Sequence, residues 1–309
     1  MEARLDSAPV SAFDYLLSRA LPLVPRPIVR RVSRRYIAGE SLPEALRAVR
    51  SLNQRGLLAT LDVLGESVTS PDQVEGAVRD YGEALAALRG EALQANISVK
   101  LTQLGLKIDR DLCLRSMRAL AQAARAQGNF VRIDMEDSTC TSATLELYRA
   151  LRAEGFDNVG VVLQAYLRRS LRDVRDLPEG ANVRLCKGIY VEPRAIAYRD
   201  RVLVNKNYVR LLEEMLERGV YVGIATHDED LVWEAQRILD RRRLAPERYE
   251  FQMLLGVDEE LRGLILEAGH RLRIYIPFGV NWYAYSLRRL KENPRIAGYV
   301  ARSLIIGRA

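Results

Sequence analysis

Cysteine and histidine are scarce in this sequence. Its three cysteines, Cys113, Cys140 and Cys186, are odd in number and far apart, which is typical of a reducing compartment and matches neither a CxxC pair nor a zinc finger. The two histidines, His227 and His270, are too few for the clusters that most catalytic zinc sites use. We therefore expect no bound metal ion.

Long apolar runs are also lacking. No stretch approaches the ~18 uninterrupted apolar residues of a membrane span, so we expect none. The first residues include Glu2, Arg4 and Asp6 and show no basic-then-apolar pattern, which argues against a secretory signal and favours a cytoplasmic location. The formal net charge of +7 is compatible with nucleic acid, an anionic membrane surface or a solvated basic surface, and does not decide between them.

Short β-branched runs alternate with amphipathic helical stretches from about residue 50 onward, which is the pattern of repeated βα units. Eight such runs are present, and they end at Glu66, Thr102, Glu136, Tyr166, Gly188, His227, Gly256 and Gly279. Helical patterns between them include residues 71–87, 110–127, 142–153, 207–217 and 229–239. Eight parallel strands close a barrel, and 309 residues is a normal length for a barrel with one short extension.

An open, doubly wound sheet is the alternative α/β fold. That fold often carries a glycine-rich phosphate turn after its first strand, and neither GxGxxG nor GxxxxGK[ST] occurs here. The sequence therefore predicts a (β/α)8 TIM-type barrel over residues 46–309. Residues 1–45 are predicted to form an N-terminal helical arm, in which a basic amphipathic helix at 27–36 packs on the barrel in preference to binding a membrane.

Polar residues lie where each predicted strand ends. Barrel enzymes place their active sites at the carboxyl ends of the strands, so polar side chains there indicate chemistry. The residues selected in this way are Glu66, Lys100, Asp134, Glu136, Gln164, Arg184, Lys187, Thr226, His227, Gln252 and Tyr275.

Three of these positions, Lys100, Arg184 and Lys187, suggest a specific chemistry. Lys100, in a run that otherwise reads as a buried strand, must meet an anion, and an ion pair with Asp134 on the next strand is one solution. A Schiff-base lysine is the alternative. In RLCKGIY, Arg184 and Cys186 share one face of the strand and Lys187 begins the loop. The arginine suits a delocalised anion and the lysine suits a phosphate. Two salt bridges are the alternative explanation for these cations.

The helix after the last predicted strand carries a charged stripe. Tyr285, Arg288, Arg289 and Glu292 fall at i, i+3, i+4 and i+7, so they share one face. Adjacent arginines match a carboxylate's need for paired donors, and Glu292 can hold one of them in place. Because a turn at Gly279 links this helix to the last strand, we expect it to lie over the barrel mouth, where the stripe binds a carboxylate; a solvent-exposed charged face is the alternative.

Together these motifs resemble the proline dehydrogenase family, whose barrel binds FAD and whose last helix carries a paired arginine. The resemblance spans about residues 60–293 and rests on ISVKLT, IDME, RLCKGIY, ATH, EFQMLLG, RIYIPFG and AYSLRRLKEN in this order. The chain is similar to the short monofunctional bacterial form. It departs from the family pattern at Cys186 and Ile189, where Val and Ala are usual, and this affects the shape of the flavin pocket.

The resemblance implies a role for each matching residue. The substrate carboxylate would be held by Lys100, Arg288 and Arg289, and the pyrrolidine ring framed by Leu254, Tyr275 and Tyr285. Asp134 and Arg184 would lie near the reactive edge of the flavin. Its other contacts would be Met135, Gln164, Lys187, Gly188, Ile189, Thr226 and His227. Glu66 would pair with Arg288 when the site closes, and Glu292 would belong to the same gate.

The resemblance also implies a reaction: hydride transfer from C5 of L-proline to flavin N5, giving Δ1-pyrroline-5-carboxylate, as the first step of proline catabolism to glutamate. A membrane quinone would accept the electrons, which gives the basic arm a reason to touch the membrane surface, and a separate pyrroline-5-carboxylate dehydrogenase would take the product. A Schiff-base or phosphate-sugar barrel enzyme and a basic binding protein without chemistry are the rival hypotheses. We expect no nucleic acid partner, because Tyr36 is the only aromatic residue in the basic N-terminal run.

Overall fold

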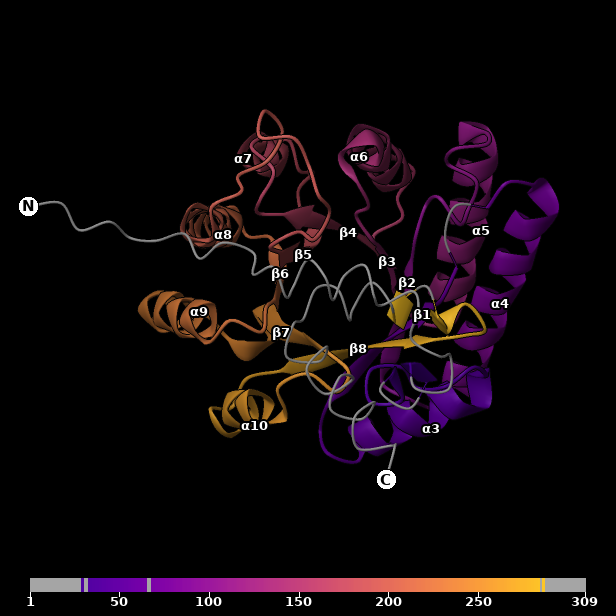
Figure 1. The fold of residues 1–309 in the computed structure, drawn as a ribbon, viewed down its shortest axis with the longest axis horizontal. Coiled ribbons are helices and arrows are strands. Elements are labelled where there is room, and N and C mark those ends of the chain that lie inside the picture. The colour runs from indigo at the N-terminus through magenta and orange to yellow at the C-terminus, as the bar shows by residue number, and fades with distance from the viewer. Residues whose placement is uncertain (1–28, 31–32, 66–67, 284, 287–309) are drawn as a thin grey trace, which may run out of the picture.

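Eight parallel strands form a closed barrel in the computed structural model, which describes residues 29–30, 33–65, 68–283 and 285–286 (Figure 1). The strands are β1 (Leu58–Val63), β2 (Ala95–Val99), β3 (Val131–Ile133), β4 (Val159–Gln164), β5 (Asn182–Cys186), β6 (Tyr221–Ala225), β7 (Tyr249–Leu254) and β8 (Leu272–Phe278). Each pairs with its neighbours in sequence, and β8 returns to β1, with Leu61 opposite Ile276. The predicted (β/α)8 barrel is therefore confirmed.

Helices surround the barrel and follow the strands in turn (Figure 1). They are α4 (Pro71–Gly90), α5 (Arg110–Ala126), α6 (Ser138–Ala153), α7 (Ser170–Arg175), α8 (Arg201–Glu217), α9 (Glu229–Arg242) and α10 (Glu259–Glu267). A short 3-10 turn, η2 (Pro246–Arg248), precedes β7.

Two helices begin earlier than their apolar pattern predicts. α6 begins at Ser138 and α8 at Arg201, four and six residues before the predicted starts at 142 and 207. Asp137 and Asp200 explain the difference, because each carboxylate accepts a backbone N–H of the first turn and so ends the loop. The capping residues, which precede the apolar pattern, were the missed signal.

The hydrophobic core lies between the strands and the helices, and the barrel interior is polar. On β2 the outward residues Ile97 and Val99 are fully buried in the apolar core, whereas Ser98 between them points inward. β3 alternates in the same way, with Arg132 inside. The apolar layer therefore stabilises the barrel, and the interior is left for charged and hydrogen-bonding side chains.

The helix α3 (Leu42–Asn53) precedes the barrel and packs against β1 and β8. The predicted boundary between residues 45 and 46 falls inside this helix, and the division into an arm and a barrel domain stays a prediction because most of residues 1–45 lie outside the described part of the chain. The end of that segment contacts the barrel: the N–H of Ala38 donates to the carbonyl of Pro277. None of the helices in the described residues is long and apolar enough to cross a membrane.

The apolar layer between helix and strand can be tested at Met117 on α5, whose side chain is fully buried. We expect Met117→Ala to lower the free energy of unfolding by about 2–5 kcal/mol, through lost apolar contacts and the cavity left behind. Arg115→Ala, on the exposed face of the same helix, should change it by less than about 0.5 kcal/mol. Urea denaturation measures both, and similar losses would contradict this assignment of the core.

Candidate active site

A cavity of about 510 Å³ lies at the carboxyl ends of the strands, where barrel enzymes place their active sites. Its lining includes every expected site residue that the structure describes: Lys100, Asp134, Met135, Gln164, Arg184, Lys187, Gly188, Ile189, Thr226, His227, Leu254, Tyr275 and Tyr285. Glu136 and Gln252, selected as strand-end polar residues, line it too. The remaining expected residues, Glu66, Arg288, Arg289 and Glu292, lie outside the described residues.

Lys100 reaches two carboxylates. Its Nζ lies 2.7 Å from Oδ1 of Asp62 and 3.9 Å from Oδ2 of Asp134. The expected pair with Asp134 is thus present, but Asp62 is the nearer partner and sequence reasoning missed it. Asp62 stands inside β1, before the polar end of the run, and alternation along that strand places it on the inner face with Thr60. A charge at an inward position of a buried strand was the available signal.

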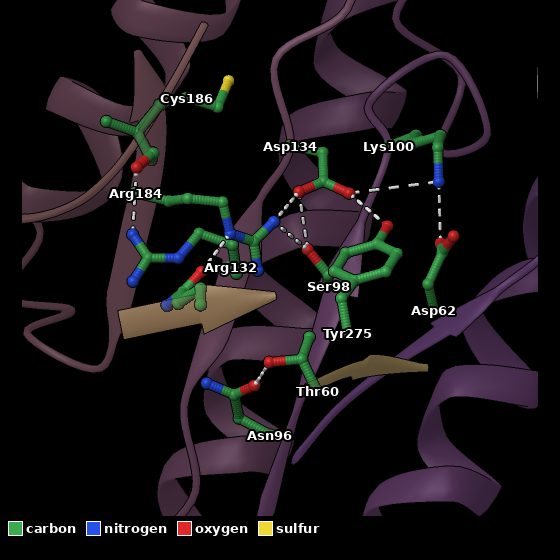
Figure 2. Close-up of polar contacts among 12 residues, drawn as sticks. Thr60, Asp62, Asn96, Ser98, Lys100, Arg132, Asp134, Arg184, Cys186 and Tyr275 are labelled. Carbon is green, nitrogen blue, oxygen red and sulfur yellow. Dashed lines mark hydrogen bonds and ion pairs between the residues drawn. The ribbon is translucent and has the colours of Figure 1, made fainter. Parts of the chain in front are cut away.

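Asp134 connects this pair to Arg184 on the far side of the barrel (Figure 2). Its Oδ1 accepts from Arg184 Nη1 at 2.6 Å and from the hydroxyl of Ser98 at 2.7 Å. Burial would raise the pKa of Asp134, but the positive charges of Arg184 and Lys100 outweigh burial and hold this pKa below its ordinary value. Asp134 is therefore an anion fixed between two cations.

The pKa of Asp62 is shifted in the opposite direction to that of Asp134. Burial raises the pKa of Asp62 above the ordinary value although Lys100 acts against this effect. The two carboxylates that share Lys100 thus differ in how readily they take a proton, which is the usual consequence of placing two acids near one cation.

Tyr275 lies in the middle of β8, so the expectation that it ends the last strand is wrong: the strand continues for three residues to Phe278. Its hydroxyl donates to Oδ2 of Asp134 at 2.7 Å, and the guanidinium of Arg184 lies 5.0 Å from the centre of its ring. Burial and the neighbouring Asp134 raise the pKa of Tyr275 well above its usual range, so the hydroxyl keeps its proton. Its ring still faces the cavity.

A second charged group lies at the rim, on the loops after β5 and β6. Lys187 forms an ion pair with Asp228, whose Oδ2 also accepts from Arg201 at 2.9 Å and from Asn205 at 3.1 Å. Burial would raise the pKa of Asp228, but these hydrogen bonds outweigh it and hold the pKa well below its usual range. With two cations around one carboxylate, this side of the cavity carries excess positive charge and suits an anionic group. Sequence reasoning missed Asp228 and Arg201, which lie in loop and helix positions.

The remaining wall offers single polar atoms. The Oε1 atom of Gln164 is buried and has no hydrogen-bond partner among the described residues, while its Nε2 donates to the carbonyl of Glu136 at 3.3 Å. His227 Nε2 accepts from the N–H of Leu254 at 3.1 Å. A buried acceptor without a donor costs free energy, so Oε1 of Gln164 is placed to accept a hydrogen bond from a ligand that carries an N–H or O–H group.

The two positions that depart from the family pattern lie at the end of β5, Cys186, and in the loop that follows it, Ile189. Burial raises the pKa of Cys186 to about 11, so this residue lines the cavity as a neutral thiol. Ile189 is 47% exposed at the rim. Gly188 between them has φ of +100°, and a Cβ there would lie 2.2 Å from the ring of Tyr166, so only glycine fits.

No group of three or more His, Cys, Asp or Glu side chains that could hold a metal ion occurs in the described residues. The cavity combines a positively charged rim, an inner guanidinium and a buried hydrogen-bond acceptor. Such an arrangement fits an extended ligand with an anionic part at the rim and a planar polar part inside.

Comparison with known proteins identifies the relatives of this chain. The family model described as "Proline dehydrogenase" matches residues 45–302. The chain is 36% identical over 308 residues to a proline dehydrogenase of Deinococcus radiodurans, covering 95% of this chain and 99% of that protein. It is 34% identical over 274 residues to proline dehydrogenase 1 of Bacillus subtilis, covering 88% and 90%.

A solved structure shares the fold. Proline utilization A (PutA) from Bdellovibrio bacteriovorus, inactivated by N-propargylglycine, superposes with a TM-score of 0.80 at 27% identity. The match covers 85% of this chain and 33% of the PutA chain, so this chain spans a third of that protein.

The buried pair Lys100 and Asp62 is expected to couple in stability. Lys100→Met removes the cation that lies 2.7 Å from Asp62 and 3.9 Å from Asp134 and leaves the buried Asp62 without its partner, so we expect a loss of about 3–5 kcal/mol in the free energy of unfolding. Asp62→Asn should cost less, because Asp134 still faces Lys100. The double variant should lose less free energy of unfolding than the two single variants lose together, by about 0.5–3 kcal/mol. Denaturant unfolding of the four proteins measures the coupling, and strictly additive losses would refute it.

Proposed function

We propose, from the premise that the chain belongs to the proline dehydrogenase family, that its cavity binds FAD and oxidises L-proline to Δ1-pyrroline-5-carboxylate. Membership of this family makes the chain an oxidoreductase of proline catabolism. The observation that carries the finer proposal is the placement of two cations, Lys100 and Arg184, around Asp134 inside one cavity.

The chain's own groups fit FAD. Lys187 and Arg201 at the rim match its diphosphate, and the buried acceptor Oε1 of Gln164 matches the ring N–H of an isoalloxazine. Met135, Gly188, Ile189, Thr226 and His227 complete the proposed contacts. FAD, when bound, supplies the acceptor for a hydride. Arg184 places a fixed positive charge where it would stabilise the negative charge that develops during the reaction.

The substrate is held by its carboxylate. We assign this role to Lys100 together with Arg288 and Arg289, with Glu66 and Glu292 as the gate; the arginines and glutamates are assigned from sequence alone. Two carboxylates hold the Lys100 ammonium in place from β1 and β3. Three cations around one carboxylate fix the orientation of proline, so that removal of the C5 hydride becomes an oriented step within one complex.

The same contacts favour this proposal over a Schiff-base lysine. A carbonyl nucleophile must be a free amine, and a lysine with carboxylates at 2.7 Å and 3.9 Å is instead stabilised as an ammonium ion. Lys100 therefore serves better as a charged binding group.

We further infer that a quinone accepts the electrons, as the family resemblance implies. We also infer that a separate pyrroline-5-carboxylate dehydrogenase takes the product, and the match to 99% of a relative named proline dehydrogenase supports this second inference. Delivery of electrons to a quinone requires a peripheral contact with the inner face of the membrane, for which the basic segment at residues 27–36 is our candidate.

Release of the cofactor tests the proposal directly. We expect the purified protein to be yellow and to release one FAD per chain on denaturation, and the native protein to reduce an artificial electron acceptor when L-proline is added. Absorbance spectra, chromatography of the released cofactor and steady-state kinetics measure these properties. A protein that releases no flavin would refute the cofactor, and one that binds flavin without oxidising proline would refute the substrate.

Tyr275 is expected to determine selectivity for the unsubstituted ring. Tyr275→Ser opens space beside the proposed proline site, so we expect the preference for L-proline over trans-4-hydroxy-L-proline, as a ratio of kcat/KM values, to fall by about tenfold. Tyr275→Phe is the matched control: it keeps the ring but loses the hydrogen bond to Asp134, and should keep the preference while lowering kcat. An unchanged ratio in Tyr275→Ser, with a loss of stability, would assign the tyrosine to packing alone.

A further inference from the structure

A chain of hydrogen bonds runs from the barrel interior to the cavity, where Gln252 and Arg184 are its last members. The Nε of Arg184 donates to Oε1 of Gln252 at 2.5 Å, and Nε2 of Gln252 donates to Oε1 of Glu250 at 2.6 Å. Glu250 in turn accepts from Nε of Arg273 at 2.6 Å. The chain crosses from β5 through β7 to β8, and Gln252 and Glu250 are 6% and 2% exposed.

Glu250 is the fixed end of this chain. Arg273 binds it with two donors, Nε at 2.6 Å and Nη2 at 3.0 Å, and the hydroxyl of Tyr221 adds a third at 3.1 Å. Burial would raise the pKa of Glu250, but Arg273 and the hydrogen bonds outweigh it and lower this pKa. A carboxylate held by this many donors keeps its charge and its position.

The charge of Glu250 decides which way the amide of Gln252 faces. A carboxylate accepts hydrogen bonds and donates none, so the amide must turn its NH2 group toward Glu250. The carbonyl oxygen of Gln252 then faces Arg184 and accepts the hydrogen bond from its Nε. Through the amide of Gln252, the position of Glu250 determines where the guanidinium of Arg184 is held.

Arg184 is held on two edges and one face. Gln252 takes Nε, Asp134 takes Nη1, and the ring of Tyr275 lies against the guanidinium. Nη2 has no hydrogen-bond partner among the side chains and backbone that the structure describes, and Arg184 lines the cavity. These contacts therefore leave one edge of the guanidinium, at Nη2, for a ligand, and they fix the direction in which that edge points.

Gly223 on β6 provides the space for Gln252. In the sheet it pairs with Arg184 on β5 and with Glu250 on β7, so it stands between the two ends of the chain. A Cβ at Gly223 would lie 2.4 Å from Nε2 and 2.8 Å from Cδ of Gln252. The backbone of Gly223 is not in the left-handed region, so alanine would disturb this contact and little else.

We propose that Gln252 and Glu250 are positioning residues for Arg184, and that Gly223 is glycine so that the amide of Gln252 can lie between them. This inference rests on the proposed function, because it is the bound FAD that Arg184 is positioned to meet. It assigns a role to Gln252, which lines the cavity beside Arg184, and to the buried Glu250, neither of which is among the proposed contacts of proline or FAD.

Two variants disturb Gln252, which connects Arg184 to Glu250, by different means. Gln252→Met removes both hydrogen bonds at similar volume, and Gly223→Ala pushes the glutamine aside. We expect each to lower kcat for proline by about 10- to 100-fold with KM nearly unchanged, since a small misplacement of a group near the reacting atoms has effects of this size. The midpoint potential of the bound flavin should fall in both, because a cation held less firmly stabilises the reduced form less.

Gly82→Ala is the matched control, since a Cβ at this glycine in α4 meets nothing within 4 Å. It should leave kcat and the potential unchanged. Repeating both variants in an Arg184→Lys protein completes a double-mutant cycle: if they act through Arg184, their effect on the potential should largely disappear there.

The outcomes separate the two proposals. Effects of equal size with and without Arg184 would show that Gln252 and Gly223 act independently and would overturn the inference. Wild-type protein that binds flavin and oxidises proline, beside variants with unchanged kcat and potential, would overturn it as well and leave the proposed function standing. Wild-type protein without flavin would instead refute the proposed function itself.

Discussion

Asp134 is a carboxylate enclosed by the barrel, and the arrangement of the cavity depends on it. Ser98, Arg184 and Tyr275 bond to it from β2, β5 and β8, and Lys100 adds a second positive charge. Taking an unpaired ion out of water costs several kcal/mol, so this carboxylate is tolerable only with its cations and hydrogen bonds in place. The same groups that make its burial possible are those that would meet a substrate and a cofactor. Stability and catalysis therefore place the same demand on this part of the chain.

The interior of the barrel is a layered polar core. Asp62, Lys100, Asp134 and Arg184 lie at the cavity, and Glu250 is buried beneath them beside its partner Arg273. Barrel interiors are more often filled by branched apolar side chains. Here the apolar contribution to folding comes from the outer layer between strands and helices, and the interior is free to serve as a support for charges. Asp134, Arg184 and Glu250 are each held by more than one partner, which makes this support rigid.

Sequence reasoning found the strands and most of the site because both leave local signals. β-branched runs indicate strands, and a charged residue in or directly after such a run stands out, as at Arg184 within β5 and Lys100 after β2. It missed Asp62 and Asp228 because their importance lies in what they meet in space, from strands or loops that are distant in sequence. It placed Tyr275 at the end of the last strand because a polar side chain was taken as the strand end, although the predicted run continues to Gly279 and β8 continues to Phe278. Helical spacing singled out the arginine pair, Arg288 and Arg289, as a carboxylate site, and both residues lie outside the described part of the chain.

Strand register connects the outer layer to the inner charges. On β3 the outward Val131 and Ile133 are fully buried among apolar side chains, while Arg132 and the following Asp134 face inward. A slip of one residue would turn the valine and isoleucine into the polar interior and the two charges into the apolar layer, and both changes are unfavourable. The hydrophobic layer thus selects the register, and the register determines which charges meet across the barrel. The position of Asp134 opposite Arg184 is in this sense set by apolar residues that never touch the cavity.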